Sequence, residues 1–393
     1  MTELNFTAVI PLSLYIHLPW CLQKCPYCDF NSHASGDALP FDHYVDALLL
    51  DLEWELPRVW GRPVRSIFIG GGTPSLFPAE EIERLLSGIR ARLPFGPEPE
   101  VTLEANPGAV EQERFAGYRQ AGVNRLSIGV QSFDDGRLEA IGRIHDGEDA
   151  ATAVEMARGA GFENINLDLM FGLPQQSRAE AMGDLQQAVA LGVEHLSWYQ
   201  LTMEPNTPFG HQPPPLPDDE ELWEMQLEGQ QLLQEEGLEQ YEISAYAREQ
   251  SECRHNLNYW RFGDYLGIGA GAHSKITMAA DGAIIRSSRQ KSPQRYMDGA
   301  GSERLLSERH TVPAHDLPLE FMMNRLRINE PFTVRQFEER TGCSWNRVES
   351  TVEKGCREGL LLRTGEQVVA TDHGREFLND LLALFMNIKQ DGE

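Results

Sequence analysis

Cys21-Leu22-Gln23-Lys24-Cys25-Pro26-Tyr27-Cys28 is a C-x₃-C-x₂-C run, and it directly follows the β-rich stretch Leu12 to His17. Because the sulfurs lie four and three positions apart after a strand, only a loop can point all of them inward. Thiolates are the ligands that iron–sulfur clusters prefer, and three of them on a four-iron cluster leave one iron without a protein ligand. We therefore predict that Cys21, Cys25 and Cys28 hold a [4Fe–4S] cluster.

A structural zinc ion is the main alternative for these cysteines. Zinc would require a closed tetrahedral shell, for which His17 and His33 are the nearest candidates for a fourth ligand. Zinc ribbons usually pair two C-x₂-C knuckles, and the sequence contains no second knuckle. A redox disulfide would use two thiols and leave the third unexplained. The cluster is therefore the preferred interpretation.

The composition narrows the class of protein. The 393 residues carry a formal net charge of −26, with 41% hydrophobic residues; this suffices for a large core and opposes binding to nucleic acid or anionic lipid. Six cysteines, three of them within eight residues, do not suit a disulfide framework and indicate a reducing, cytoplasmic compartment. Pro11, His17 and Pro19 interrupt the apolar stretch Ala8 to Leu22, so we expect neither a signal peptide nor a transmembrane segment.

Short β-rich runs alternate with stretches of helical period along the first half of the chain. Helical spacing of apolar residues is visible in Asp42 to Leu49 and in Glu80 to Leu86. Strands that are apolar on both faces and alternate with helices indicate a parallel sheet covered by helices, either open or closed into a barrel. The six expected strands are Leu12 to His17, Ser66 to Ile69, Val101 to Ala105, Arg125 to Val130, Asn164 to Phe171 and His195 to Leu201.

Three regions are expected along the chain, namely residues 1–210, 211–312 and 313–393. The middle region begins with the proline-rich connector His211 to Pro217, continues as an acidic helix from Asp218 to Glu236 and later reaches the glycine-rich stretch Gly267 to Ser274. The pattern of the last region predicts three helices followed by a hairpin around Gly365-Glu366, and a winged helix has this order of elements. It shows no arginine-rich face, so we interpret it as a packing module.

Polar residues and glycines gather where the expected strands end. The run Gly70-Gly71-Gly72-Thr73-Pro74 closes the second strand and permits a ligand to approach the backbone closely. Glu104, Gln131 and Asp168 stand at the same ends of later strands, and Arg143 follows in a helical segment. A polar side chain inside an apolar strand is costly unless it meets a partner, either a core neighbour or a ligand. Because ligands bind at the carboxyl ends of parallel strands, the four together favour a binding site.

The cysteine run after the first strand resembles that of the radical SAM superfamily. The resemblance implies that S-adenosylmethionine (SAM) chelates the open iron and is reductively cleaved to a 5′-deoxyadenosyl radical, chemistry that belongs to the cofactor. It also implies that Tyr27 packs on the adenine of SAM. The expected fold is therefore an α/β protein, a partial (β/α)6 radical SAM barrel with a C-terminal winged-helix-like α+β module.

The stretch from Tyr15 to about Ser274 resembles the branch that contains oxygen-independent coproporphyrinogen III oxidase and its relatives. The likeness rests on Tyr15 to Cys21, the Gly-Gly-Gly-Thr-Pro element, Gly129 to Ser132 and Asp168 to Pro174. The residues that it places near the cluster-bound SAM are Tyr15, Gly71, Glu104 and Thr202. Those that match the positions of a second SAM in the oxidase are Tyr27, Gly72, Thr73, Gln131, Arg143 and Asp168.

Two departures separate the sequence from the oxidase. Its first strand begins almost at the N-terminus, without room for the expected leading segment, and Asp29-Phe30 stands where the oxidase has Gly-Cys. The run Cys25 to Phe30 and the motif His255-Asn256-Leu257-Asn258-Tyr259-Trp260 instead resemble a sister branch of heme chaperones.

The second resemblance implies that the protein binds heme and transfers it to acceptor apoproteins. Radical decarboxylation of coproporphyrinogen III, in heme synthesis, is the alternative function, and at this point it is open whether the protein is an enzyme. An RNA-modifying radical enzyme is a third class, but it would need a basic face that the net charge of −26 does not suggest.

His255 is the candidate heme contact. Its imidazole could offer a nitrogen to the iron, and Tyr259 and Trp260 could offer aromatic faces to the macrocycle. The alternative is a core histidine whose hydrogen bonds are satisfied by its neighbours. Cys253 could supply a thiolate, although a buried, isolated thiol is the preferred interpretation.

Overall fold

The computed structural model describes residues 4–36, 39–108 and 113–386. All six strands expected in the first region are present, and each pairs in parallel with the next. Strands β1, β6 and β7 are buried along nearly their whole length, as their near-continuous apolar sequence requires. The strands are β1 (Leu12–Leu18), β4 (Val64–Gly71), β5 (Phe95–Ala105), β6 (Arg125–Gln131), β7 (Ile165–Phe171) and β8 (His195–Gln200).

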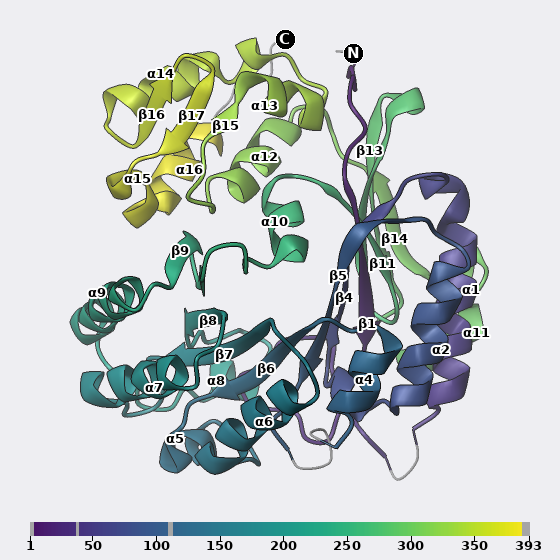
Figure 1. Ribbon diagram of the computed structural model, residues 1–393. Coiled ribbons are helices and arrows are strands. Elements are labelled where there is room, and N and C mark those ends of the chain that lie inside the picture. Colours follow the sequence, from purple (N-terminus) through teal and green to yellow (C-terminus); the bar gives the residue numbers. More distant parts are fainter. Residues whose placement is uncertain (1–3, 37–38, 109–112, 387–393) are drawn as a thin grey trace.

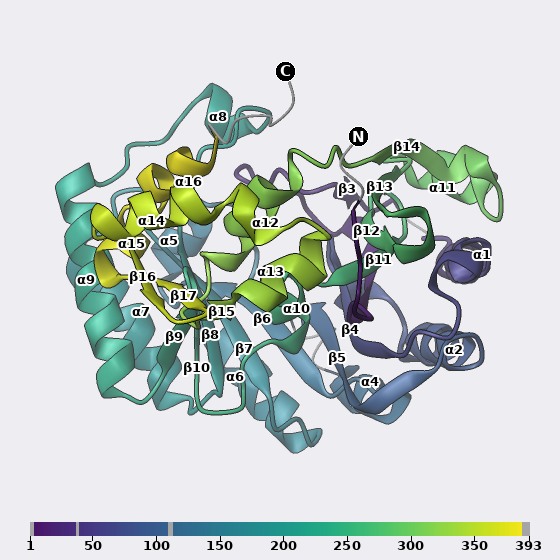
Figure 2. The same ribbon diagram turned by 90° about the horizontal axis from the view of Figure 1, so that it is seen from above.

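The helices between these strands cover the outer face of the sheet (Figure 1). Apolar side chains at helical spacing, such as Ile82, Leu85 and Ile89 of α2, are fully buried. The helices are α1 (Phe41–Val59), α2 (Ala79–Arg90), α4 (Phe115–Ala121), α5 (Asp135–Ala140), α6 (Gly147–Gly159) and α7 (Arg178–Ala190). Seen from above, the strands follow an arc with these helices outside it (Figure 2), so the fold is the expected α/β partial barrel.

The middle region extends this sheet at both ends, giving a sheet of 12 strands. Strand β11 pairs in parallel with β1, and β12, β13 and β14 continue antiparallel beyond it. At the other end β10 pairs antiparallel with β8 and β9. These strands are not predicted from the sequence, and the region boundaries stay a prediction. The bounds are β9 (Glu239–Glu242), β10 (Ala245–Ala247), β11 (Asp264–Ile268), β12 (His273–Met278), β13 (Ala283–Arg289) and β14 (Leu306–Thr311).

Shorter elements complete the first two regions. The acidic helix is α9 (Asp219–Glu235), and the Asp218 carboxylate caps it by accepting a hydrogen bond from the Glu221 amide. Strands β2 (Trp20–Cys21) and β3 (His33–Ala34) form a separate parallel pair. The remaining elements are α8 (Pro208–His211), α10 (Arg254–Trp260), α11 (Pro293–Gly299) and the 3₁₀ turns Pro74–Leu76, Ala279–Asp281 and Glu303–Leu305.

The C-terminal region is a small α+β module. Its sheet has the order β15-β17-β16, and the expected hairpin joins β16 to β17. Phe321, Phe337 and Trp345 of the module share a core with Phe262 and Ile284 of the middle region, which supports the packing role. The elements are α12 (Leu317–Arg325), β15 (Phe332–Thr333), α13 (Val334–Thr341), the 3₁₀ turn Trp345–Arg347, α14 (Glu349–Arg357), β16 (Leu361–Thr364), β17 (Gln367–Ala370), α15 (Asp372–Glu376) and α16 (Leu378–Met386). Among the helices of the described ranges, none is long and apolar enough to cross a membrane.

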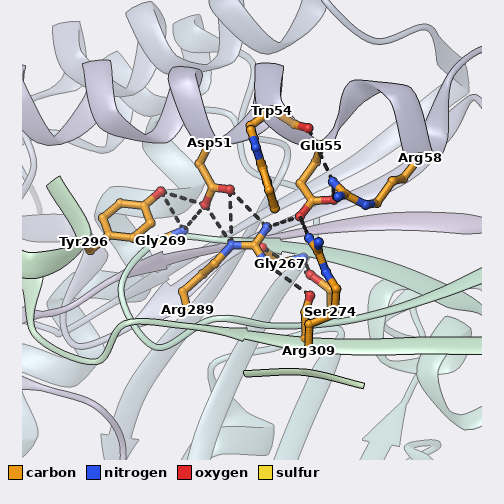
Figure 3. Close-up of polar contacts among 11 residues, drawn as sticks. Asp51, Trp54, Glu55, Arg58, Gly267, Gly269, Ser274, Arg289, Tyr296 and Arg309 are labelled. Carbon is orange, nitrogen blue, oxygen red and sulfur yellow. Dashed lines mark hydrogen bonds and ion pairs between the residues drawn. The ribbon is translucent and has the colours of Figure 1, made fainter. Parts of the chain in front are cut away.

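A buried network of charges joins α1 to the extended edge of the sheet (Figure 3). Arg289 of β13 donates to both oxygens of Asp51 at 3.1 Å and to Glu55 at 2.9 Å. The Tyr296 hydroxyl donates to Asp51 at 2.8 Å. Because the guanidinium is fully buried, these hydrogen bonds replace its hydration. The network therefore fixes α1 against strands that lie more than 200 residues away in the sequence.

Candidate functional site

The cysteine loop is fixed from both sides at the carboxyl end of β1. The amide of Gly72 donates to the carbonyl of Leu18 at 2.8 Å, and the amide of Thr73 donates to the carbonyl of Trp20 at 2.7 Å. On the far side of the loop, the Ser35 amide donates to the Cys21 carbonyl at 2.7 Å. These hydrogen bonds fix the backbone at both ends of the loop. The cysteines between them line a common pocket.

The three cysteines predicted to hold a four-iron cluster line the same pocket. Cys21, Cys25 and Cys28 line one pocket, and none of them forms a disulfide. Burial raises the pKa of Cys21 and Cys28, which favours the neutral thiol, and a bound metal would deprotonate a coordinating thiol. Within the described ranges, no three His, Cys, Asp or Glu side chains converge on a point suited to a single metal ion. A cluster instead takes each thiolate on a different iron, which suits cysteines that surround a pocket.

The histidines considered for a zinc shell have other partners. His17 Nε2 donates to the Asn31 carbonyl at 2.9 Å, and Nδ1 accepts from the Tyr15 hydroxyl at 2.9 Å. His33 lies 3.2 Å from the carbonyl of Lys291. His17 therefore has no free ring nitrogen for zinc, and within the described residues neither histidine belongs to a group of three or more His, Cys, Asp or Glu side chains placed to hold one metal ion.

The glycine run brings backbone close to the pocket. Gly71 has a φ of 122°, and a Cβ at this position would lie 2.6 Å from the His17 ring. A Cβ on Gly72 would lie 2.5 Å from the carbonyl oxygen of Trp20. A side chain at Gly71 would displace the His17 ring, and one at Gly72 would displace the backbone that leads into the cysteine loop, so only glycine permits this close turn.

Two buried carboxyl groups face the same pocket. Glu104 accepts a hydrogen bond from the Gly71 amide at 3.0 Å, and burial together with the charge of Asp168 raises its pKa to about 7. Asp168 accepts from the Ser127 hydroxyl at 3.1 Å and the Asn166 amide at 2.9 Å, and burial raises its pKa as well. Two carboxyl groups that are costly to ionise can be stabilised by a cationic ligand, such as the amino or sulfonium group of SAM.

Arg143 connects the cluster loop to the ends of β5 and β6. Its guanidinium donates to the Asn106 side chain at 2.9 Å, to the Gly129 carbonyl, and to the Cys25 sulfur at 3.8 Å. Gln131 has a positive φ of 69° and accepts a hydrogen bond from the Tyr199 hydroxyl at 3.0 Å. A non-glycine residue in the left-handed region is held there by its surroundings, here at a strand end that lines the pocket.

The structure brings most of the predicted site residues together and leaves three outside. Those that line the cysteine pocket are Cys21, Cys25, Tyr27, Cys28, Gly71, Gly72, Thr73, Glu104, Gln131, Arg143 and Asp168. Thr202 is exposed and lies 3.3 Å from Glu204. Tyr15 and His255 line a neighbouring cavity of 280 Å³, which also touches Glu104 and Asp168.

Asn106 and Tyr199 also line the cysteine pocket, and they are not among the residues predicted from the sequence. Each has a signal in the sequence, since Asn106 directly follows a strand and Tyr199 belongs to the alternating polar series His195, Ser197, Tyr199.

His255 is buried on α10, and the cavity that it lines touches Glu104, Ser127 and Asp168, which also line the cysteine pocket. One ring nitrogen lies 3.1 Å from the Ser66 hydroxyl and the other 2.9 Å from the Tyr259 hydroxyl. Burial and the nearby Arg125 lower its pKa to about 3, so the ring is neutral. Ligation of heme iron would require the ring to leave one of these partners. The arrangement in this structure is that of a satisfied core histidine.

Cys253 is also buried in the core. Its thiol donates to Glu100 at 3.7 Å, and burial raises its pKa to about 12. At neutral pH it is therefore a thiol and not a ligand thiolate.

The fold and the cysteine motif are similar to those of known protein families. The model of the Radical SAM superfamily matches residues 15–188, and that of the HemN C-terminal domain matches residues 312–377. The solved structure of coproporphyrinogen III oxidase (HemN) from Escherichia coli superposes with a TM-score of 0.81 and 24% identity, covering 96% of this chain and 90% of that one. The fold and the cysteine site therefore define a radical SAM protein, a class that holds a [4Fe–4S] cluster and SAM.

Curated relatives narrow the class further. The proteins named heme chaperone HemW from Escherichia coli and Haemophilus influenzae are 51% and 50% identical, each covering 96% of this chain and 98% of the relative. The one from Bacillus subtilis is 34% identical and covers 95% of this chain and 99% of the relative. The chain belongs to the HemW family.

The contact between Glu104 and SAM can be tested separately from the cluster. Glu104→Ala is expected to weaken SAM binding by about 10- to 100-fold, because a hydrogen bond to a charged group contributes about 1.5–3 kcal/mol. In the unaltered protein, SAM affinity should fall as pH drops below about 7, since Glu104 then becomes protonated and loses its charge. Isothermal titration of the cluster-loaded protein measures both effects.

The exposed Glu148 offers a matched control. Glu148→Ala should bind SAM as the unaltered protein does, and the iron content of both variants should be unchanged. Equal loss of iron and of SAM in Glu104→Ala would contradict a ligand contact and indicate a structural role.

Proposed function

We propose that this protein binds heme and passes it to acceptor apoproteins, and that it carries a [4Fe–4S] cluster and SAM. The observation that supports this most is the 51% identity, over 96% of the chain, to a protein named heme chaperone HemW. In this proposal the cluster and SAM supply redox chemistry, while the chain orients them through Glu104, Arg143 and the glycine turn and keeps them buried.

Oxidation of coproporphyrinogen III is not favoured. The oxidase of known structure shares 24% identity with this chain, about half of that shared with the heme chaperone of the same organism, and its likeness supports the fold alone. Asp29 and Phe30, which stand where the oxidase pattern has Gly-Cys, are exposed directly after the cysteine loop. The pocket next to the cluster therefore differs from the oxidase pattern at its mouth.

The partners in this proposal are heme and the apoproteins that accept it. A chain with a net charge of −26 repels polyanions, so nucleic acid is not among its partners. All six cysteines are unpaired, which supports a reducing compartment such as the cytoplasm.

A parallel assay distinguishes the two functions. Anaerobically reconstituted protein, supplied with SAM and reductant, is incubated with coproporphyrinogen III while a second portion is titrated with heme. We expect heme binding and no carbon dioxide release from the propionates. SAM-dependent release of carbon dioxide would overturn the chaperone assignment and restore the oxidase.

A further inference from the structure

A second pocket, of 560 Å³, adjoins the cysteine pocket on the side of Arg143 and Cys25. Its volume lies within the range of cofactor sites, about 300–1,000 Å³. Leu22, Phe41 and Ile144 contribute apolar side chains to its lining. The side chains of Leu22 and Ile144 are 52% and 67% exposed, so two large apolar groups face solvent there. A hollow of this size with apolar side chains in its lining can receive a cofactor-sized apolar ligand.

His145 lines this pocket, and the hydrogen bonding of its ring leaves one nitrogen free to bind a metal. Its Nε2 lies 2.9 Å from the Val130 carbonyl, and a carbonyl can only accept, so Nε2 carries the proton. The lone pair is therefore on Nδ1, which has no hydrogen-bond partner within the residues that the structure describes. Histidines that bind metals commonly donate their other ring N–H to a backbone carbonyl in this way, which fixes the tautomer.

The surroundings of His145 keep its ring neutral. Burial and the guanidinium of Arg143 lower its pKa to about 4, against the weaker opposing effects of the Val130 carbonyl and of Asp146. At neutral pH the lone pair on Nδ1 is thus available to iron without loss of a proton.

The charges around the pocket suit the propionates of heme. Among the residues that the structure describes, Arg114, Arg143 and one carboxylate, Asp149, line it. An apolar macrocycle with two carboxylates at one edge matches a pocket with apolar walls and two guanidinium groups.

From this geometry we propose that heme binds in the pocket beside the cluster, with Nδ1 of His145 as an axial ligand of its iron. The inference rests on the proposed heme-binding function and assigns its site. It also places the iron of heme next to the cluster loop, since Cys25 and Arg143 line both pockets. His255, whose two ring nitrogens are engaged by the Ser66 and Tyr259 hydroxyls, is then not the axial ligand.

The test is heme titration of cluster-loaded variants, followed by absorption and electron paramagnetic resonance spectra of the ferric complex. His145→Ala is expected to lower heme affinity by about tenfold or more and to change the spin state of the iron. Added imidazole should restore the spectrum of the unaltered protein. Ile144→Glu, at an exposed position, should also weaken binding, because its carboxylate repels the propionates and removes apolar surface.

Two control variants distinguish ligation by His145 from ligation by a surface histidine or by His255. His43→Ala removes an imidazole from the surface of α1, where the side chain is 77% exposed, and should leave affinity and spectrum unchanged. His255→Ala should keep the heme spectrum. The inference is overturned if His145→Ala and Ile144→Glu bind heme with unchanged affinity and spectrum, or if His255→Ala alone loses the axial ligand. Failure of the unaltered protein to bind heme would instead reject the proposed function itself.

Discussion

Replacement of Cys25 by alanine is expected to leave the protein without its [4Fe–4S] cluster. In the proposed site three thiolates hold the cluster, and a site with three ligands rarely tolerates the loss of one. Cys25 is partly exposed on a loop outside the hydrophobic core, so the fold should persist while iron and sulfide fall to background after anaerobic reconstitution. Iron and sulfide analysis and the visible absorption of the cluster measure this loss.

Cys356 provides a control of the same residue type. It is also partly buried and unpaired, but it lies on α14 in the C-terminal module. Cys356→Ala should reconstitute a full cluster. A Cys25→Ala variant that retains stoichiometric iron and sulfide, or an unaltered protein that holds one tight zinc ion and no iron, would contradict the assignment.

Arg289→Leu is expected to destabilise the fold by about 3–5 kcal/mol, the usual cost of leaving buried charges without their partner. The substitution would leave the carboxylates of Asp51 and Glu55 on α1 buried without the guanidinium that now bridges them. Equilibrium unfolding in urea, read as a shift of the midpoint at unchanged slope, measures the loss.

Arg178 offers the comparison for an exposed pair. Its side chain is 51% exposed and bridges Glu224 and Glu228 on the surface. Arg178→Leu should cost at most about 1 kcal/mol, because exposed ion pairs contribute little. If both arginine variants were equally stable, the buried network would not be what holds α1 against β13.

The sequence predicts the parallel strands and the cluster loop because their signals are local. Short apolar runs indicate the strands, and the spacing of Cys21, Cys25 and Cys28 indicates the loop. Glu104, Gln131 and Asp168 meet in one pocket because parallel strands end at the same edge, a consequence of topology that follows from the strand pattern alone.

Features that depend on distant partners could not be predicted. Strand β11 inserts beside β1 across about 250 residues of sequence, and no local pattern marks that pairing. In the sequence, Asp51 resembles a residue on the solvent-facing side of an amphipathic helix. In the structure it is buried and forms an ion pair with Arg289 of β13.

The partners of two predicted contact residues also depend on the fold, and their contacts with SAM and heme stay predictions. Thr202 lies in the loop beyond β8, where its side chain turns to Glu204 instead of the pocket. His255 stands out in the sequence for its aromatic neighbours, but Ser66, from another strand, is one of the partners that satisfy its ring. The residues next to His255 in the sequence do not indicate a partner that comes from a distant strand.

Heme binding is measured directly by titrating heme into the anaerobically reconstituted protein, followed by absorption and by protein fluorescence. We expect saturable binding at a fixed ratio of heme to chain, with a spectrum distinct from that of free heme and with the cluster retained throughout. Heme that adds without saturation, or that leaves the spectrum of free heme unchanged at every ratio, would contradict it.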